Sequence, residues 1–366
     1  MTNSLFDKHP DFVVRQVNPF NAGPPPRLLH RSYITPTDLF FVRSHGDVPE
    51  VDADSYRLEV TGRVLRPLSL SLDDIKNNFE RVNISATLQC AGNRREELMA
   101  LKSIPNELGW GVEAISHAVW AGIRLRDVLA AAGVEGAAEL HQHVEFGGLD
   151  EVECLDKRFR YGGSIPLAKG LSPEVILAYK MNGEPLTPVH GFPLRTIVPG
   201  YIGARSVKWL DRIIVQDEPS QNYFQSHAYR LFAAYIGPET AEWEEGVMLG
   251  ETSISSVICS HYENEWIPAE VLTVQGYSIT GGTEIARVEV SWDGGSNWMQ
   301  AELFNDTSRW AWTLWKASFE LKPGKYQLVV RAIDTSDNTQ PQDVSQVWNF
   351  KGYMNNAWHR VNIEVG

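Results

Sequence analysis

The final third of the chain alternates apolar and polar residues with a period of two, and this pattern constrains its fold more than any other feature. The alternation is found in Val271 to Ile279, Arg287 to Trp292, Trp298 to Leu303 and Tyr326 to Ala332. Such segments form strands with one apolar face, and Asp293-Gly294-Gly295 is typical of a hairpin turn. Residues 245–366 are therefore predicted to form an immunoglobulin-like β-sandwich, without the paired cysteines of true immunoglobulins.

The residues before this region mix short strands with a few helices. Helical spacing covers Leu72 to Phe79 and Leu125 to Ala132, and Gly133 suits a helix C-terminus. The predicted strands are Tyr56 to Val64, Ile84 to Leu88, His143 to Phe146 and Leu194 to Val198. No Gly-rich nucleotide loop follows a strand, which disfavours a Rossmann fold. We therefore expect an α+β domain over residues 36–235.

Residues 1–35 differ from both regions because they are rich in proline and polar side chains, including Gly23-Pro24-Pro25-Pro26. This composition predicts an extended arm lying over a domain rather than an element of a core. An acidic, turn-rich stretch, residues 216–246, is expected to link the two domains. At 366 residues the chain exceeds the size of one ordinary core, which supports a two-domain organisation.

The formal net charge of −13 argues against nucleic acid and anionic membranes as partners, since both repel an acidic surface. The N-terminal residues lack a basic segment followed by an apolar one, and no apolar run has membrane-spanning length. Cys90, Cys154 and Cys259 are too few and too scattered for a disulfide framework, and they form no CxxC pair. These features together predict a cytoplasmic protein that does not bind membranes.

The most unusual local stretch runs from Thr87 to Arg95 and places Cys90 directly after an apolar strand. Small residues follow the cysteine, and Arg94 and Arg95 come next. Nearby guanidinium groups favour a thiolate, which is a ligand for soft or redox-active metals, while arginine binds oxyanions. A buried structural cysteine beside surface arginines explains the same residues, so the stretch by itself leaves both interpretations open.

Two other stretches combine cationic and apolar residues. One runs from His190 to Arg195 and continues at Gly203 to Trp209, and its imidazole, guanidinium and ammonium groups suit a phosphate or a polar heterocycle. The other, Phe40 to His45, is predicted as a strand with Arg43 and His45 on one face. Taken singly, the ordinary interpretations are a solvated charged loop and an edge strand.

Taken together and in order, these stretches resemble the cofactor-binding segments of eukaryotic-type sulfite oxidases. The resemblance is carried by Phe41-Val42-Arg43-Ser44-His45, Leu88 to Arg95, and Met181 to Trp209, and it spans residues 30–366. Trp292-Asp293-Gly294-Gly295 and Asn355 to Arg360 are similar to the dimerisation domain of that family. The resemblance implies a mixed α/β molybdopterin-binding domain followed by a dimerisation domain, and it implies a homodimer.

The resemblance also implies roles for individual residues. Cys90 would ligate molybdenum. The residues that would hold the molybdopterin are Phe41, Val42, Arg43, Ser44, His45, Cys90, Asp150, His190, Arg195, Ser206, Val207 and Lys208. The residues that would act in catalysis are Arg43, Cys90, Arg95, Tyr229 and Arg309. Trp110 would line the same pocket.

The activity that the resemblance implies is oxidation of sulfite to sulfate by oxo transfer. The cofactor would be the molybdenum cofactor, with no haem or flavin in this chain, and electrons would pass to an external acceptor such as a cytochrome or oxygen.

Two other functions stay open. Nitrate reductases share this module, and the acidic segment Glu96 to Gly109 departs from the basic segment of sulfite oxidases. The second alternative is a non-catalytic binding or scaffold protein on the same fold.

Overall fold

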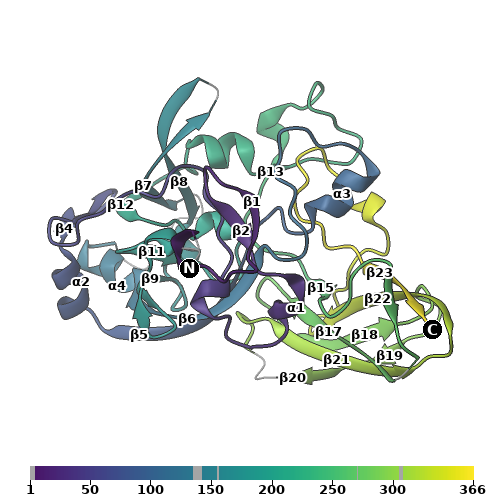
Figure 1. Ribbon diagram of the computed structural model, residues 1–366. Coiled ribbons are helices and arrows are strands. Elements are labelled where there is room, and N and C mark those ends of the chain that lie inside the picture. The colour runs from purple at the N-terminus through teal and green to yellow at the C-terminus, as the bar shows by residue number, and fades with distance from the viewer. Residues whose placement is uncertain (1–4, 135–141, 155, 270, 305–307) are drawn as a thin grey trace.

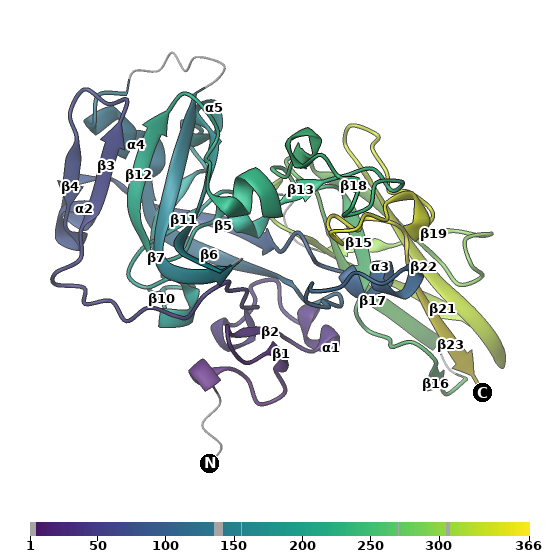
Figure 2. The same ribbon diagram turned by 90° about the horizontal axis from the view of Figure 1, so that it is seen from above.

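The computed structural model describes residues 5–134, 142–154, 156–269, 271–304 and 308–366. Two lobes lie side by side, and the N-terminal segment crosses the place where they meet (Figures 1 and 2). No helix in the described part of the chain combines the length and the apolarity needed to cross a bilayer.

The first lobe contains two five-stranded sheets. One has the strand order β4-β3-β12-β7-β8, and the other has the order β10-β9-β6-β5, with β11 also paired to β9. The bounds are β3 (Leu58–Gly62), β4 (Leu68–Leu70), β5 (Arg81–Gln89), β6 (Ile115–Arg124), β7 (His143–Cys154), β8 (Lys157–Pro166), β9 (Ile176–Met181), β10 (Glu184–Pro185), β11 (Arg195–Ile197) and β12 (Leu210–Gln216). All four strands predicted in this region are present; β5 and β7 extend beyond the predicted bounds, and β3 and β11 are shorter than predicted.

Short helices pack against the sheets of this lobe, namely α2 (Leu72–Asn78), α4 (Leu125–Ala131) and α5 (Leu167–Gly170). Another helix, α3 (Arg95–Leu101), instead packs against the 3-10 turn η7 (Val344–Gln346) beside the second lobe (Figure 1). The predicted helices α2 and α4 are confirmed. Ser71 starts α2 with a capping box to Asp74, and Gly133 follows α4 with a positive φ of 82°. Leu58, Val128 and Phe146 are fully buried in one core that joins a sheet to α4.

The second lobe is a sandwich of a four-stranded and a five-stranded sheet, which confirms the predicted β-rich domain. The first sheet contains β15 (Ser255–Ile258), β17 (Val271–Ile279), β21 (Thr313–Glu320) and β20 (Glu302–Phe304). The second contains β16 (Glu265–Ile267), β23 (His359–Val365), β22 (Gly324–Asp334), β18 (Ile285–Ser291) and β19 (Met299–Gln300). Val274, Val288 and Leu328 are fully buried between the two sheets.

One predicted strand of the sandwich is two strands. Residues Trp298 to Leu303 separate into β19, which pairs with β18, and β20, which pairs with β21. The chain therefore crosses from one sheet to the other at Ala301, whose N–H donates to the Val288 carbonyl at 2.8 Å and whose side chain is buried. An alternating sequence cannot distinguish one strand from two strands that face the same core from opposite sheets.

The prediction of a purely extended N-terminal arm is wrong for the described part, while residues 1–4 lie outside it. The segment forms a small hairpin, β1 (Val13–Gln16) with β2 (Asn21–Gly23), and a short helix α1 (Pro26–Leu29). Phe12, Phe20 and Ala22 are buried against Val42 and Val189 of the first lobe. Spaced apolar residues among the prolines give the arm a core contact that composition alone does not indicate.

Between the lobes, residues 216–246 contain the π-helical turn η5 (Phe224–Ala228), the 3-10 turn η6 (Trp243–Glu245) and β13 (Arg230–Leu231), which pairs with β14 (Val247–Met248). The stretch is ordered by aromatic packing, since Trp243 stacks on His227 and meets Phe350 edge-on.

A buried histidine makes the stability of this fold depend on pH. His117 on β6 contacts the hydroxyls of Ser85 and Thr87 at 2.7 and 2.8 Å, and burial lowers its pKa from 6.5 to about 3. Because the unfolded chain takes up the proton first, the free energy of unfolding falls as pH decreases from about 6.5 toward 3. Between pH 7 and pH 5 this group accounts for a loss of about 2 kcal/mol.

We therefore expect His117→Gln to lose about 2 kcal/mol less stability than the wild type over that pH interval. The measurement is urea unfolding at both pH values. An equal loss in the two proteins would contradict the assignment.

Candidate active site

A cavity of about 650 Å³ opens in the first lobe beside the end of β5. It is lined by Phe40, Phe41, Val42, Arg43, Ser44, His45, Leu88, Cys90, Asp150, Tyr161, His190, Arg195, Gly203, Ala204, Ser206, Val207, Lys208, Trp209 and Tyr229. The structure thus brings every residue predicted to hold molybdopterin to one cavity, together with Tyr229.

Cys90 lies at the point where β5 ends and a tight turn begins. Its N–H donates to the carbonyl of Ala114 at 2.9 Å, its carbonyl accepts from Asn93 at 3.0 Å, and the N–H of Gly92 approaches Sγ at 3.4 Å. A Cβ on Gly92 would lie 2.6 Å from the Arg95 guanidinium, so a larger residue there would displace the end of that side chain. The thiol is buried but borders the cavity, as a metal ligand must.

The segment from Phe40 to His45 is a loop rather than the predicted strand. Its only ladder contact among the described residues is a bridge between Val42 and Ala22 of the arm. The Asn21 side chain holds the loop, because its Oδ1 accepts from the Ser44 N–H at 2.8 Å and from Arg43 at 3.2 Å. Arg43 and His45 still face each other, at 3.0 Å.

The hydrogen bonds of His45 determine how Tyr229 is presented. Arginine only donates, so His45 Nδ1 accepts from Arg43 and Nε2–H donates to the Tyr229 oxygen at 2.7 Å. Burial, with Arg43 and Lys208 nearby, lowers the pKa of His45 well below its usual value. Burial also raises the pKa of Tyr229 to about 12, against the opposing effect of Arg43. A neutral Tyr229 hydroxyl can therefore donate to a bound anion.

Two further cationic side chains, Lys208 and Arg195, line the cavity. Lys208 donates to the hydroxyl of Ser44 at 2.7 Å and to the carbonyl of Val189 at 3.1 Å. Arg195 donates to the carbonyls of His190 and Ser206 at 3.0 and 3.1 Å, and burial lowers its pKa to about 9. Burial likewise lowers the pKa of Lys208 well below its usual value. These bonds go to neutral groups, so the charges are not neutralised by them.

Asp150 is the acidic residue that lines the cavity. Burial raises its pKa to about 6, while Lys208 acts in the opposite direction, and its Oδ1 atom is buried with no hydrogen-bond partner among the described residues. One carboxylate facing several cations leaves a positive excess, and an unpaired acceptor calls for an N–H donor. A ligand with an anionic group and a polar N–H edge fits both.

Arg95 lies outside this cavity, at the edge of a second group of charged residues. Its guanidinium donates to the carbonyls of Gly352 and Leu108 at 3.0 and 2.8 Å and stacks over the Tyr353 ring at 4.9 Å. Glu107 accepts from Lys351 at 2.5 Å and lies 3.4 Å from Arg95. The acidic segment that departs from the family pattern thus places a carboxylate between two cations.

Trp110 and Arg309, the other two predicted pocket residues, do not line the cavity. Trp110 is fully buried in the same apolar cluster as Cys90, and its indole N–H has no partner among the described residues. Arg309 does not line the cavity: it is exposed and stacks over the Trp310 ring at 4.6 Å. The sequence places Arg309 next to a buried strand, but the turn that precedes β21 directs it outward.

The structure adds residues that the sequence did not reveal, above all Lys8 and Asn21 of the arm and Lys351 near the C-terminus. Lys8 is buried and its Nζ lies 2.7 Å from His190 Nε2. Burial lowers the pKa of Lys8 to about 7. Isolated polar residues in a polar segment carry no pattern, so only their folded positions identify them.

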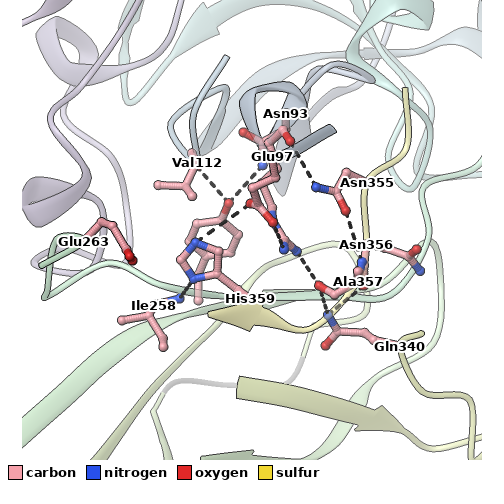
Figure 3. A network of polar contacts seen from close by, with 12 residues as sticks. Asn93, Glu97, Val112, Ile258, Glu263, Gln340, Asn355, Asn356, Ala357 and His359 are labelled. Carbon is pink, nitrogen blue, oxygen red and sulfur yellow. Dashed lines mark hydrogen bonds and ion pairs between the residues drawn. The ribbon is translucent and has the colours of Figure 1, made fainter. Parts of the chain in front are cut away.

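A polar network joins the turn after Cys90 to the second lobe (Figure 3). Asn93 donates to the Tyr277 hydroxyl at 3.0 Å. Arg94 forms a bidentate pair with Glu97 at 2.7 Å and donates to the carbonyl of Ala357 at 2.8 Å. Asn355 returns a hydrogen bond to the Arg94 carbonyl at 3.0 Å. The turn that carries the cysteine is therefore held by both lobes.

The comparisons with known proteins agree with this architecture. The model of the oxidoreductase molybdopterin binding domain matches residues 45–224, and that of the Mo-co oxidoreductase dimerisation domain matches residues 247–366. Sulfite oxidase of Arabidopsis thaliana is 38% identical over 98% of this chain and 95% of its own length. The chain belongs to the sulfite oxidase family.

Other relatives show the range of this family. Mitochondrial sulfite oxidase of Homo sapiens is 44% identical over 98% of this chain, which spans 66% of the human protein. A nitrate reductase of Hordeum vulgare is 39% identical over 98% of the chain and 42% of its own length. The sulfane dehydrogenase SoxCD from Paracoccus pantotrophus has a TM-score of 0.77 at 25% identity, covering 95% of this chain and 87% of that one.

The residues of the cavity fit the molybdenum cofactor. The cations suit its phosphate, and the free Asp150 oxygen suits an N–H group of the pterin. No group of three or more His, Cys, Asp or Glu side chains among the described residues could chelate a metal ion. Cys90 would thus add one thiolate to a metal that arrives with ligands of its own.

The cationic side of the cavity should be unfavourable without an anion. We expect Lys208→Met to raise the thermal midpoint of the cofactor-free chain, because it removes the desolvation free energy of the Lys208 ammonium. Each kcal/mol of that free energy corresponds to about 3 °C. The same variant should retain less molybdopterin after purification. Calorimetry and pterin fluorescence measure the two effects, and the exposed Lys76→Met is the matched control. A lower midpoint with full cofactor content would contradict the charge argument.

Proposed function

We propose that this chain is a molybdenum-dependent sulfite-oxidising enzyme that forms sulfate and passes its electrons to an external acceptor. The observation that carries the proposal is the position of Cys90, whose thiol borders a cavity with a cation-rich side and a Tyr229 hydroxyl free to donate. The likeness to sulfite oxidases of plants and animals supports the same substrate class.

Five side chains of the cavity have distinct parts in this reaction. Cys90 would hold the metal, while Lys208 and Arg195 would bind the anionic end of the cofactor. When bound, the molybdenum cofactor supplies two-electron oxo-transfer chemistry. Arg43 orients the substrate anion with fixed positive charge, and Tyr229 donates a hydrogen bond to a substrate oxygen. Burial of both groups strengthens these interactions relative to water.

Nitrate reduction is the second candidate, because a nitrate reductase matches nearly the whole chain and Glu107 makes the group around Arg95 less basic. Turnover of sulfite with an oxidising dye, compared with turnover of nitrate with a reducing dye, separates the two activities. Metal analysis separates both from a scaffold protein, which would contain no molybdenum. Nitrate turnover alone would replace the sulfite proposal.

The proposal also includes the quaternary arrangement and the partners. The match to a dimerisation domain supports a homodimer. The physiological acceptor is proposed to be a separate redox partner, such as a cytochrome or oxygen, and neither nucleic acid nor a membrane is proposed as a partner of this acidic chain.

The role of Cys90 is tested by Cys90→Ser. We expect loss of turnover by at least about a thousandfold, since a hydroxyl is a poor ligand for a soft metal. The fold should persist, because the long Gly92 N–H contact is the only hydrogen bond that the described residues make to the thiol. Turnover, circular dichroism and the thiolate-to-metal absorption are the measurements. The buried Cys259, which lies in the second lobe, supplies the matched control Cys259→Ser. Full activity of Cys90→Ser would exclude the mechanism.

Arg43 is tested by replacement with methionine. Loss of a charged hydrogen bond costs about 1.5–3 kcal/mol, so KM for sulfite should rise roughly 10-fold to 100-fold. Arg43→Lys retains the charge without the planar guanidinium, so its KM should lie between that of the wild type and that of the methionine variant. Steady-state kinetics decide, and an unchanged KM in the methionine variant would remove Arg43 from the substrate site.

A further inference from the structure

Lys8 is an unusual residue for a segment that precedes the first lobe. Its side chain is 4% exposed, and Nζ lies 2.7 Å from the Thr37 carbonyl oxygen, 2.9 Å from that of Phe40 and 2.7 Å from His190 Nε2. Lysine is seldom buried to this extent unless its ammonium group is paired with other polar groups. Lys8 does not line the cavity, whereas His190 does.

The three contacts of Lys8 determine the protonation of His190. In its protonated form the Lys8 ammonium has three donors and no acceptor, and each donor has one partner here. Opposite the protonated form of Lys8, His190 Nε2 is an acceptor. Burial and the nearby cations Lys8, Arg195 and Lys208 lower the pKa of His190 well below its usual value, so the ring is neutral. Its single proton consequently lies on Nδ1.

A second arm residue acts on the other side of the cavity. Asn21 donates through Nδ2 to the Ser44 carbonyl at 3.1 Å, and its Oδ1 accepts from the Ser44 N–H and from Arg43. Asn21 is fully buried. The arm thus contacts both of the chain segments, one containing Ser44 and the other containing His190, that face the bound ligand.

Other interactions also hold the arm. Phe12 and Phe20 are buried against Val42 and Val189, and a β-bridge joins Ala22 to Val42. Arg15 pairs with Glu113 at 2.6 Å and with Glu96 at 2.6 Å. Two-stranded hairpins are marginally stable on their own, and elements with small cores open at a lower free energy than the whole fold.

We propose that Lys8 is a positioning residue of the molybdopterin site, which reaches from the N-terminal arm and holds His190 with its proton on Nδ1 as a donor to the cofactor. This inference rests on the cofactor site of the proposed function. By linkage, a bound cofactor stabilises the docked arm to the same extent that the docked arm stabilises the cofactor. Release of the arm frees His190 and Ser44 together.

The test compares Lys8→Met with Arg15→Met in the full-length holoenzyme. Arg15→Met loosens the arm without touching His190, so it reports the anchoring role alone. The first readout is the ¹⁵N spectrum of histidine side chains, with the His190 signal assigned from a His190→Gln variant. The second is the rate at which pterin and molybdenum are lost during dialysis.

We expect the wild type to show a protonated Nδ1 and an acceptor Nε2 on His190. Lys8→Met should shift His190 toward the other tautomer and release cofactor about tenfold faster. Arg15→Met should leave the tautomer unchanged, whatever its release rate. Lys8→Met with a wild-type tautomer and a wild-type release rate would overturn the proposal.

Two further measurements distinguish failure of this inference from misfolding of Lys8→Met and from failure of the proposed function. If Lys8→Met does not fold, Lys8→Arg, which keeps a cationic donor, should retain the His190 tautomer, and loss of that tautomer would count against the role of Lys8. If the wild type contains neither molybdenum nor pterin, the proposed function fails. In that case the tautomer of His190 in the metal-free chain still decides whether Lys8 positions it.

Discussion

The unneutralised positive charge in the cavity of the first lobe is the constraint on which the rest of the structure depends. Arg195 is buried and Lys208 is half-buried, and their hydrogen bonds go to carbonyls and a hydroxyl rather than to carboxylates. Asp150 is the one acidic residue of the lining and keeps a free oxygen. Burying cations with too few counter-charges raises the free energy of the folded chain. The cavity therefore favours an anionic ligand.

Three parts of the chain converge on that cavity. The first lobe supplies β5, which ends at Cys90, and the loops that carry His190 and Lys208. The second lobe holds the turn after Cys90 through the network in Figure 3. The arm holds Ser44 and His190 from outside. The residues that line the cavity are therefore held in place by contacts from all three parts of the chain.

Much of the fold was accessible to sequence reasoning because it follows local patterns. The alternation over Val271 to Ile279 matches β17 to the residue, and the Ser71 cap and Gly133 mark the ends of α2 and α4. The patterns failed where two structures share one pattern. Trp298 to Leu303 is divided between two sheets, and the arm buries Phe12 and Phe20 despite its prolines.

By itself the sequence determined the class of both domains, the thiol at the end of a strand and the cationic segments that follow it, because periodicity and motif order are local properties of the chain. Only the tertiary structure decided which charges face each other. It brought His45 to Tyr229 and Lys8 to His190, pairs that are 184 and 182 residues apart, and it turned Arg309 away from the cavity. Such pairings arise when distant segments pack together, and no spacing along the chain encodes them.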